Sequence, residues 1–134
     1  MQWACICARH ILLLYGEKTD PRLEQAFEVA RKWQLGEATV GEARKAALGA
    51  IAVARASTNP VSVVVARAVG HAVATAYVAD HALGPALYAL KARNLAGQSI
   101  DAERDWQNAQ LPIEIRELVL SARIPKEKAF KLLE

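Results

Sequence analysis

The stretch 68–84 constrains the fold of this chain more than any other segment. It consists mainly of Ala and Val, yet it carries His71 and His81, and Arg67 directly precedes it. It belongs to a longer apolar run, residues 60–78, and a helix that is apolar nearly all round must be buried on most sides. Arg67 and His71 at the centre of the run argue against insertion into a membrane. The sequence therefore predicts that residues 60–78 form the buried central helix of a soluble protein.

Caps, prolines and glycines divide the chain into helices. Ser, Thr, Asp and Asn are preferred N-caps, proline is favoured in the first turn, and glycine commonly ends a helix. These signals, which include N-caps at Asp20, Thr39, Asn59 and Ser99, divide the chain into eight helices. The helices are predicted over residues 2–15, 21–36, 39–56, 60–78, 80–97, 99–110 and 111–123, with a short tail helix from Pro125. Pro85 allows the fifth helix to begin either at Asp80 with a distorted first turn or nearer Gly84.

No segment alternates between apolar and polar residues with a period of two, and the predicted connections are short. Short connections favour antiparallel neighbours. The fold class predicted is therefore all-α, a compact bundle of about six to eight antiparallel helices. At this length residues 1–134 are expected to form a single helical domain.

The net charge and the cysteine content limit the kinds of partner and the cellular compartment that are expected for this chain. The formal net charge is only +3, from 17 basic and 14 acidic residues, and most of the excess lies within residues 41–100. These basic residues are scattered without interleaved aromatic residues, which disfavours nucleic-acid binding and suits a basic face that meets an acidic protein. Cys5 and Cys7 point in different directions on a helix, so no mutual disulfide is expected. With no signal peptide or transmembrane pattern near the start, the sequence predicts a cytoplasmic protein without a membrane partner.

Arg67, His71 and Thr75 form the best candidate site. Their i, i+4, i+8 spacing places them in one polar stripe on an apolar helix. Tyr77 and His81 can approach the C-terminal end of this stripe. Three interpretations are open: a structural network that fixes helix packing, a recognition surface, and a catalytic or metal site.

Neither a metal nor a cofactor is expected. His10, His71 and His81 would supply three nitrogen ligands if they converged, but the ligand spacings of zinc and di-iron sites and the glycine-rich phosphate loops are absent. The acidic residues of the C-terminal third are predicted to lie on a solvated face; they are Glu103, Asp105, Glu114 and Glu117. Enzymatic activity has little support from these residues, so a role without catalysis is favoured.

Sequence blocks along almost the whole chain carry a family resemblance. The central block is Arg67-Ala-x-Gly70-His71-Ala-x-Ala-Thr75, and it continues with His81-Ala-Leu-Gly84. The flanking blocks are Trp3-Ala-x-x-Cys7-Ala-x-His10, Arg31-Lys-Trp33-x-x-Gly36-Glu37, Glu42-Ala-Arg-Lys-Ala-Ala47, Tyr88-Ala-Leu-Lys-Ala92, and Glu103-Arg-Asp-Trp-Gln107 with Leu111-Pro112. Together they resemble the small helical bacterial proteins described as putative immunity proteins, the Imm-5-like group. Tyr77 and Pro85 depart from the family pattern, which has a histidine and a small residue there.

The resemblance implies a cytoplasmic bacterial protein that neutralises a cognate protein toxin by stoichiometric binding, without catalysis. The residues expected to bind are Arg67, His71, Thr75, Tyr77, His81 and His10. Two alternatives remain open. One is a ligand- or metal-binding helical enzyme centred on His71 and His81, and the other is a structural helical homo-oligomer that uses its Ala-rich faces as the subunit interface.

Overall fold

The computed structural model describes residues 1–16 and 18–130, with the backbone alone at position 80. Within these residues the chain forms seven α-helices and three short 3₁₀ helices, and no strand. The α-helices are α1 (Gln2–His10), α2 (Pro21–Gln34), α3 (Val40–Ala56), α4 (Pro60–Ala74), α5 (Gly84–Leu95), α6 (Ile100–Ala109) and α7 (Arg116–Ala129). The 3₁₀ helices are η1 (Leu12–Tyr15), η2 (Ala79–Leu83) and η3 (Ile113–Ile115). The predicted all-α bundle is confirmed.

Four helices begin at the N-caps that the sequence predicts. The side chains of Asp20, Asn59 and Ser99 accept hydrogen bonds from backbone amides in the first turns of α2, α4 and α6. Thr39 and Glu42 form a reciprocal capping box at the start of α3. These bonds satisfy amides that a helix start otherwise leaves without a partner. Because the cap and its target are neighbours in sequence, local reasoning was sufficient here.

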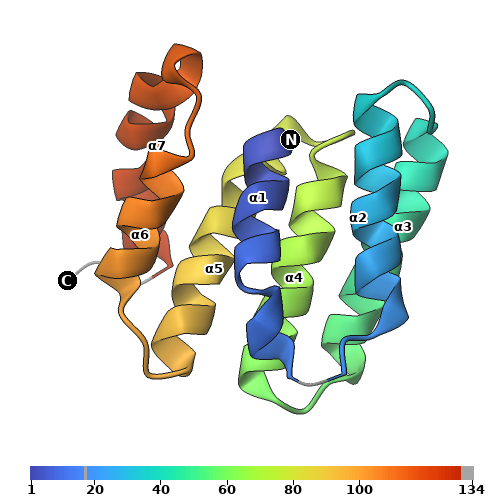
Figure 1. The fold of residues 1–134 in the computed structure, drawn as a ribbon, viewed down its shortest axis with the longest axis horizontal. Coiled ribbons are helices and arrows are strands. Elements are labelled where there is room, and N and C mark those ends of the chain that lie inside the picture. The colour runs from blue at the N-terminus through green and yellow to red at the C-terminus, as the bar shows by residue number, and fades with distance from the viewer. Residues whose placement is uncertain (17, 131–134) are drawn as a thin grey trace.

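The helix α4 is the centre of the bundle, as the sequence predicts. It packs against α1, α2, α3 and α5, and Figure 1 shows it between α5 on one side and the α2–α3 pair on the other. Ten of its 15 residues are buried. This burial explains why the helix is apolar nearly all round. Among the described helices, none has the combination of length and hydropathy that spanning a bilayer requires.

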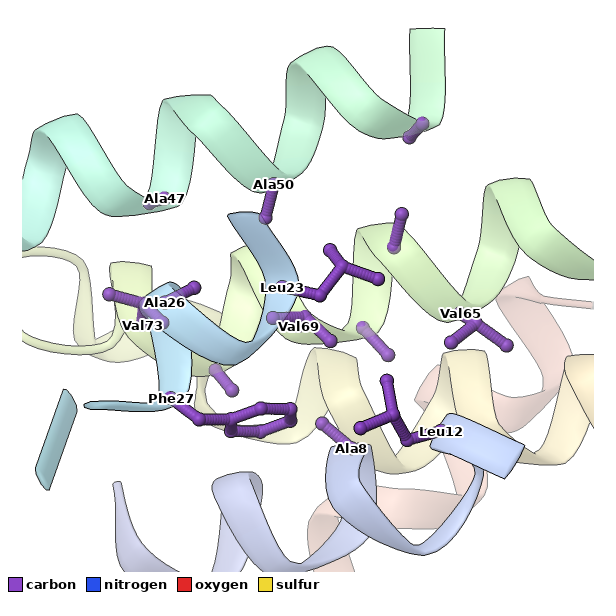
Figure 2. Close-up of a cluster of buried hydrophobic side chains, with 14 of the residues drawn as sticks. Ala8, Leu12, Leu23, Ala26, Phe27, Ala47, Ala50, Val65, Val69 and Val73 are labelled. Carbon is purple, nitrogen blue, oxygen red and sulfur yellow. The ribbon is translucent and has the colours of Figure 1, made fainter. Parts of the chain in front are cut away.

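Small side chains fill the core around α4. Figure 2 shows Ala47 and Ala50 of α3 facing Val69 and Val73 of α4, with Phe27 of α2 below them. All five side chains are buried, and they belong to one hydrophobic cluster. Alanine at these positions lets neighbouring helices approach closely. These alanine side chains are therefore buried by contacts within the chain, and they cannot form a subunit interface.

A second, smaller cluster attaches the C-terminal helices to the bundle. It joins Trp3 and Cys7 of α1 with Ala86 of α5 and with Leu111 in the α6–α7 connection. Figure 1 shows α6 and α7 at the end of the molecule opposite to α2 and α3. Cys7 is fully buried in this cluster with a free thiol, and it packs there as a small apolar side chain.

Several predicted boundaries differ from the structure; the first helix, for example, ends at His10 rather than at residue 15. The helix α4 ends at Ala74 rather than at residue 78, because Thr75 closes it and its hydroxyl donates to the carbonyl of His71. The helix α5 begins at Gly84, the later of the two starts that Pro85 allowed, and Pro85 lies in the first turn, where its missing amide would have no partner within the helix. Pro125 does not start a separate tail helix but lies inside α7. Its flanking residues Arg123 and Glu127 form an ion pair that spans the proline.

Candidate functional site

Two of the predicted site residues, His71 and His81, lie side by side. His71 belongs to α4 and His81 to η2, and their ring centroids are 4.5 Å apart with the planes inclined by 33°. Tyr88 of α5 meets His71 edge-on at 5.1 Å between centroids. Phe130, directly after α7, meets Tyr88 edge-on at 5.4 Å. We name these four residues the His71–His81 cluster. It joins segments from four parts of the chain.

Gly84 makes room for the imidazole of His71. A Cβ atom at position 84 would lie 2.8 Å from Nδ1 and 3.3 Å from Cβ of His71. Real Cβ atoms do not approach that closely, so any larger residue would displace the ring. The glycine in the sequence His81-Ala-Leu-Gly84 is therefore explained by the close approach of α5 to α4.

Neither imidazole of the pair has a hydrogen-bond partner at Nδ1 among the described residues, and both Nδ1 atoms are shielded from solvent. Leaving a buried polar atom without a partner costs about 1–3 kcal/mol. Burial in the first place, and then the proximity of His81 and Arg67, lowers the pKa of His71 to about 4. His71 is therefore neutral near pH 7. The pair differs from the fully bonded structural network that one interpretation of the sequence predicts.

The lowered pKa of His71 predicts a loss of stability on acidification. The unfolded chain binds a proton at this residue near pH 6.5, whereas the folded chain does so only near pH 4. The folded state therefore loses stability relative to the unfolded state as the pH falls from about 6.5 toward 4. Above pH 6.5 His71 is neutral in both states, and the free energy of unfolding has its full value. Urea titrations at several pH values should show wild type losing on the order of 2 kcal/mol more than His71→Gln over this range, less than the full shift would give because the ring is only half-buried and solvent screens its charge. Parallel curves for the two proteins would contradict the assignment.

Arg67, Thr75 and Tyr77, the other predicted residues of this site, have different surroundings. Arg67 is exposed on α4, one turn before His71. Thr75 bonds to the carbonyl of His71 rather than to its ring, with a distance of 3.0 Å from Oγ1 to the carbonyl oxygen. Tyr77 lies under Arg44 of α3, whose guanidinium carbon is 5.2 Å from the ring centroid. The stripe is therefore not one continuous site, and Arg67 is the member that stays close to the imidazole pair.

His10 belongs to a second cluster at another place in the fold. Its Nδ1 atom lies 2.9 Å from one carboxylate oxygen of Glu103 and 3.0 Å from the other. Its ring stacks on Trp106 of α6, with centroids 3.4 Å apart. Arg93 of α5 bonds to the same carboxylate at 3.2 Å. His10 is therefore held by α5 and α6, away from the partners of His71 and His81.

Glu103 is the residue that sequence reasoning misplaced. It was predicted on a solvated face, but its side chain is only 2% exposed and binds His10, Arg93 and Gln107. Gln107 in turn accepts a hydrogen bond from Arg123 at 2.7 Å. The 103/107 spacing of i, i+4 is visible in the sequence. The partners lie as far as 93 positions away, so nothing local identified the cluster.

The buried polar network continues into α7. Arg123 is only 2% exposed, and its guanidinium binds Glu127 at 3.2 Å. Glu127 also accepts a hydrogen bond from Arg104 of α6 at 2.7 Å. The indole of Trp3 donates to the backbone carbonyl of Gln107. This network satisfies its buried charges with partners from α1, α5, α6 and α7, so its role is to fix how these helices pack.

Among the side chains that the structure describes, which do not include that of residue 80, no group of three or more His, Cys, Asp or Glu is placed to hold a metal ion. His10 is bound to Glu103, whereas His71 and His81 contact each other. The three histidines therefore do not assemble into the shared ligand set that the sequence left open.

Comparison with known proteins gives one positive result. The family model described as "Imm-5 like putative immunity protein" matches residues 1–114 of the chain. No curated protein and no solved structure matches the chain. The matched residues include every α-helix from α1 to α6, and thus all three histidines.

Proposed function

We propose, from the premise that the chain belongs to the Imm-5-like family of putative immunity proteins, that it neutralises a protein toxin by binding it stoichiometrically and without catalysis. The observation that carries the proposal is the family match over residues 1–114. A protein of this kind acts by covering or distorting the active site of its toxin, with affinity from a few buried anchors and from charge complementarity.

The geometry of the His71–His81 cluster favours binding over catalysis. A histidine that acts as general base needs a group at its other ring nitrogen that orients it and stabilises the charged form. Neither Nδ1 has such a partner among the described residues, and the pKa of His71 is lowered. A neutral, half-buried ring beside an exposed arginine is instead suited to contact with a protein surface. Histidine and arginine side chains of this kind can anchor an interface.

The proposal is tested by co-expressing this chain with candidate toxins encoded by genes adjacent to its own. We expect that one of them arrests growth of the host alone and that co-expression restores growth. Size-exclusion chromatography with light scattering should then show a complex with equal numbers of the two chains. Restored growth without a complex would contradict stoichiometric binding, and turnover of the toxin or its product would favour the enzyme alternative.

A double substitution tests whether the His71–His81 cluster contributes to binding. We expect His71→Ala with His81→Ala to weaken toxin binding by about tenfold or more, the cost of removing anchors near the centre of an interface. Since neither Nδ1 has a partner among the described side chains, removing the rings leaves none of those side chains without a hydrogen-bond partner. The free energy of unfolding should therefore change only by the loss of ring packing. Both quantities are measured together, by calorimetric titration and by urea unfolding.

His10→Ala provides the comparison for this test. Its ring binds Glu103 and stacks on Trp106, so its loss should lower the free energy of unfolding while toxin affinity stays within about twofold of wild type. If the double variant loses stability but keeps its affinity, the His71–His81 cluster has a structural role only.

A further inference from the structure

One face of α3 carries exposed cations with an exposed apolar residue between them. Arg44, Leu48 and Arg55 are spaced i, i+4 and i+11, so they lie on one side of the helix. All three are exposed, and Leu48 has 60% of its surface accessible. Arg44 and Arg55 are about 16 Å apart along the helix axis, from the rise of 1.5 Å per residue.

The packing of α3 on α4 brings Arg67 to the same side of the molecule. A Cβ atom at Gly70 would lie 2.8 Å from Cδ1 of Ile51, so the two helices are tightly packed there. Ile51 continues the stripe of Arg44 and Arg55, and Gly70 lies one turn after Arg67 on α4. We name the surface of Arg44, Leu48, Arg55 and Arg67 the basic α3–α4 face. Arg67 lies one turn before His71 on the same side of α4, so this face borders the His71–His81 cluster.

Negative charge is nearly absent from this part of the chain. Between residues 43 and 100 the sequence contains one acidic residue, Asp80. Among the described side chains, Arg44, Arg55 and Arg67 have no carboxylate within ion-pair distance. Six other arginines do have such partners; they are Arg9, Arg22, Arg31, Arg93, Arg104 and Arg123. The charges of the basic α3–α4 face are therefore uncompensated within the described structure and create a positive potential over it.

We propose that the basic α3–α4 face binds an acidic patch on the partner protein. This inference rests on the proposed function, because it specifies the chemistry of the toxin surface that the chain covers. Arginine and leucine together provide charge complementarity around an apolar contact, which is how a protein surface is recognised.

A protein partner is favoured over a nucleic acid by the same residues. Nucleic-acid grooves combine closely spaced cations with aromatic rings that are free to stack on bases. Here Arg44 and Arg55 are about 16 Å apart along α3 with Leu48 between them. The ring of Tyr77 is covered by Arg44, and the ring of Tyr88 packs against His71 and Phe130.

The test uses a probe that requires no knowledge of the toxin. Fluorescein-labelled poly-L-glutamate of about 20 residues and a DNA duplex of about 20 base pairs are titrated separately at low salt. We expect wild type to bind poly-L-glutamate more tightly than DNA. The variant Arg44→Glu, Arg55→Glu, Arg67→Glu should bind poly-L-glutamate at least about tenfold more weakly. The control Lys32→Glu, Arg116→Glu, Lys128→Glu has the same change in net charge at three exposed positions of α2 and α7, and should stay within about threefold of wild type.

Two results would overturn the inference. Equal losses in the two triple variants would show that only net charge is sensed, and tighter binding of DNA would assign the face to nucleic acid. If charge reversal disturbs folding in a melting experiment, the neutral variant Arg44→Gln, Arg55→Gln, Arg67→Gln replaces it, with a loss of about threefold or more expected.

A protection experiment with the toxin distinguishes failure of this inference from failure of the proposed function. If wild type and the face variant protect equally against a neighbouring toxin, the function stands and the face is not the site of contact. If no neighbouring toxin is neutralised by wild type while the poly-L-glutamate results hold, the proposed function fails and an acidic protein partner of another kind remains.

Discussion

The variant Ala72→Asp is expected to lose about 3–5 kcal/mol of unfolding free energy. Ala72 is fully buried on α4, in the cluster that joins α1 to α5. A carboxylate placed there loses its hydration and gains no partner, which is among the most costly changes that one residue can produce. Val64→Asp should behave alike, because Val64 is only 3% exposed. Urea unfolding monitored by circular dichroism measures the effect.

Arg67→Asp is the matched control, since it places the same side chain at an exposed position of the same helix. We expect it to change the free energy of unfolding by less than about 1 kcal/mol. If Ala72→Asp melts like this control, α4 is not the buried centre of the bundle.

Removing the buried carboxylate of Glu103 is expected to cost about 2–4 kcal/mol in Glu103→Ala. Arg93, His10 and Gln107 all bind this carboxylate, and its loss removes one buried partner from each of them. Glu103→Gln should cost less, because an amide keeps part of the hydrogen bonding while the ion pairs are lost. Asp105→Ala, an exposed carboxylate two positions away, should change stability by less than about 0.5 kcal/mol. Equal effects of Glu103→Ala and Asp105→Ala would contradict the buried network.

Features encoded by neighbouring residues were predictable from the sequence. The caps Asp20, Thr39, Asn59 and Ser99 bond to amides two or three positions away, so residue type and spacing identify them. The central position of α4 follows from its composition, because no other arrangement buries such a helix on most sides. The place of Pro125 inside α7 was missed. What supports α7 there is the pairing of Glu127 with Arg123 and with Arg104 of α6.

The candidate site was only partly predictable. The i, i+4 spacing put Arg67 and His71 on one side of α4, and the short distance to His81 along the chain made their meeting plausible. His10 lies apart from that pair because it binds Glu103 and stacks on Trp106. Both residues are more than 90 positions from His10 in the sequence. The positive face depends on how α3 packs on α4 at Gly70 and Ile51, which requires the three-dimensional structure.

The claim that this chain binds its toxin through the basic α3–α4 face and the adjoining His71–His81 cluster is tested most directly by amide hydrogen exchange on the complex. Exchange is compared in the free chain and in the chain saturated with the toxin that it neutralises. The account predicts slower exchange in peptides that cover residues 44–55 and 67–71, with little change in α2 and α7. Protection confined to α2 or α7, with α3 and α4 exchanging as in the free chain, would contradict it.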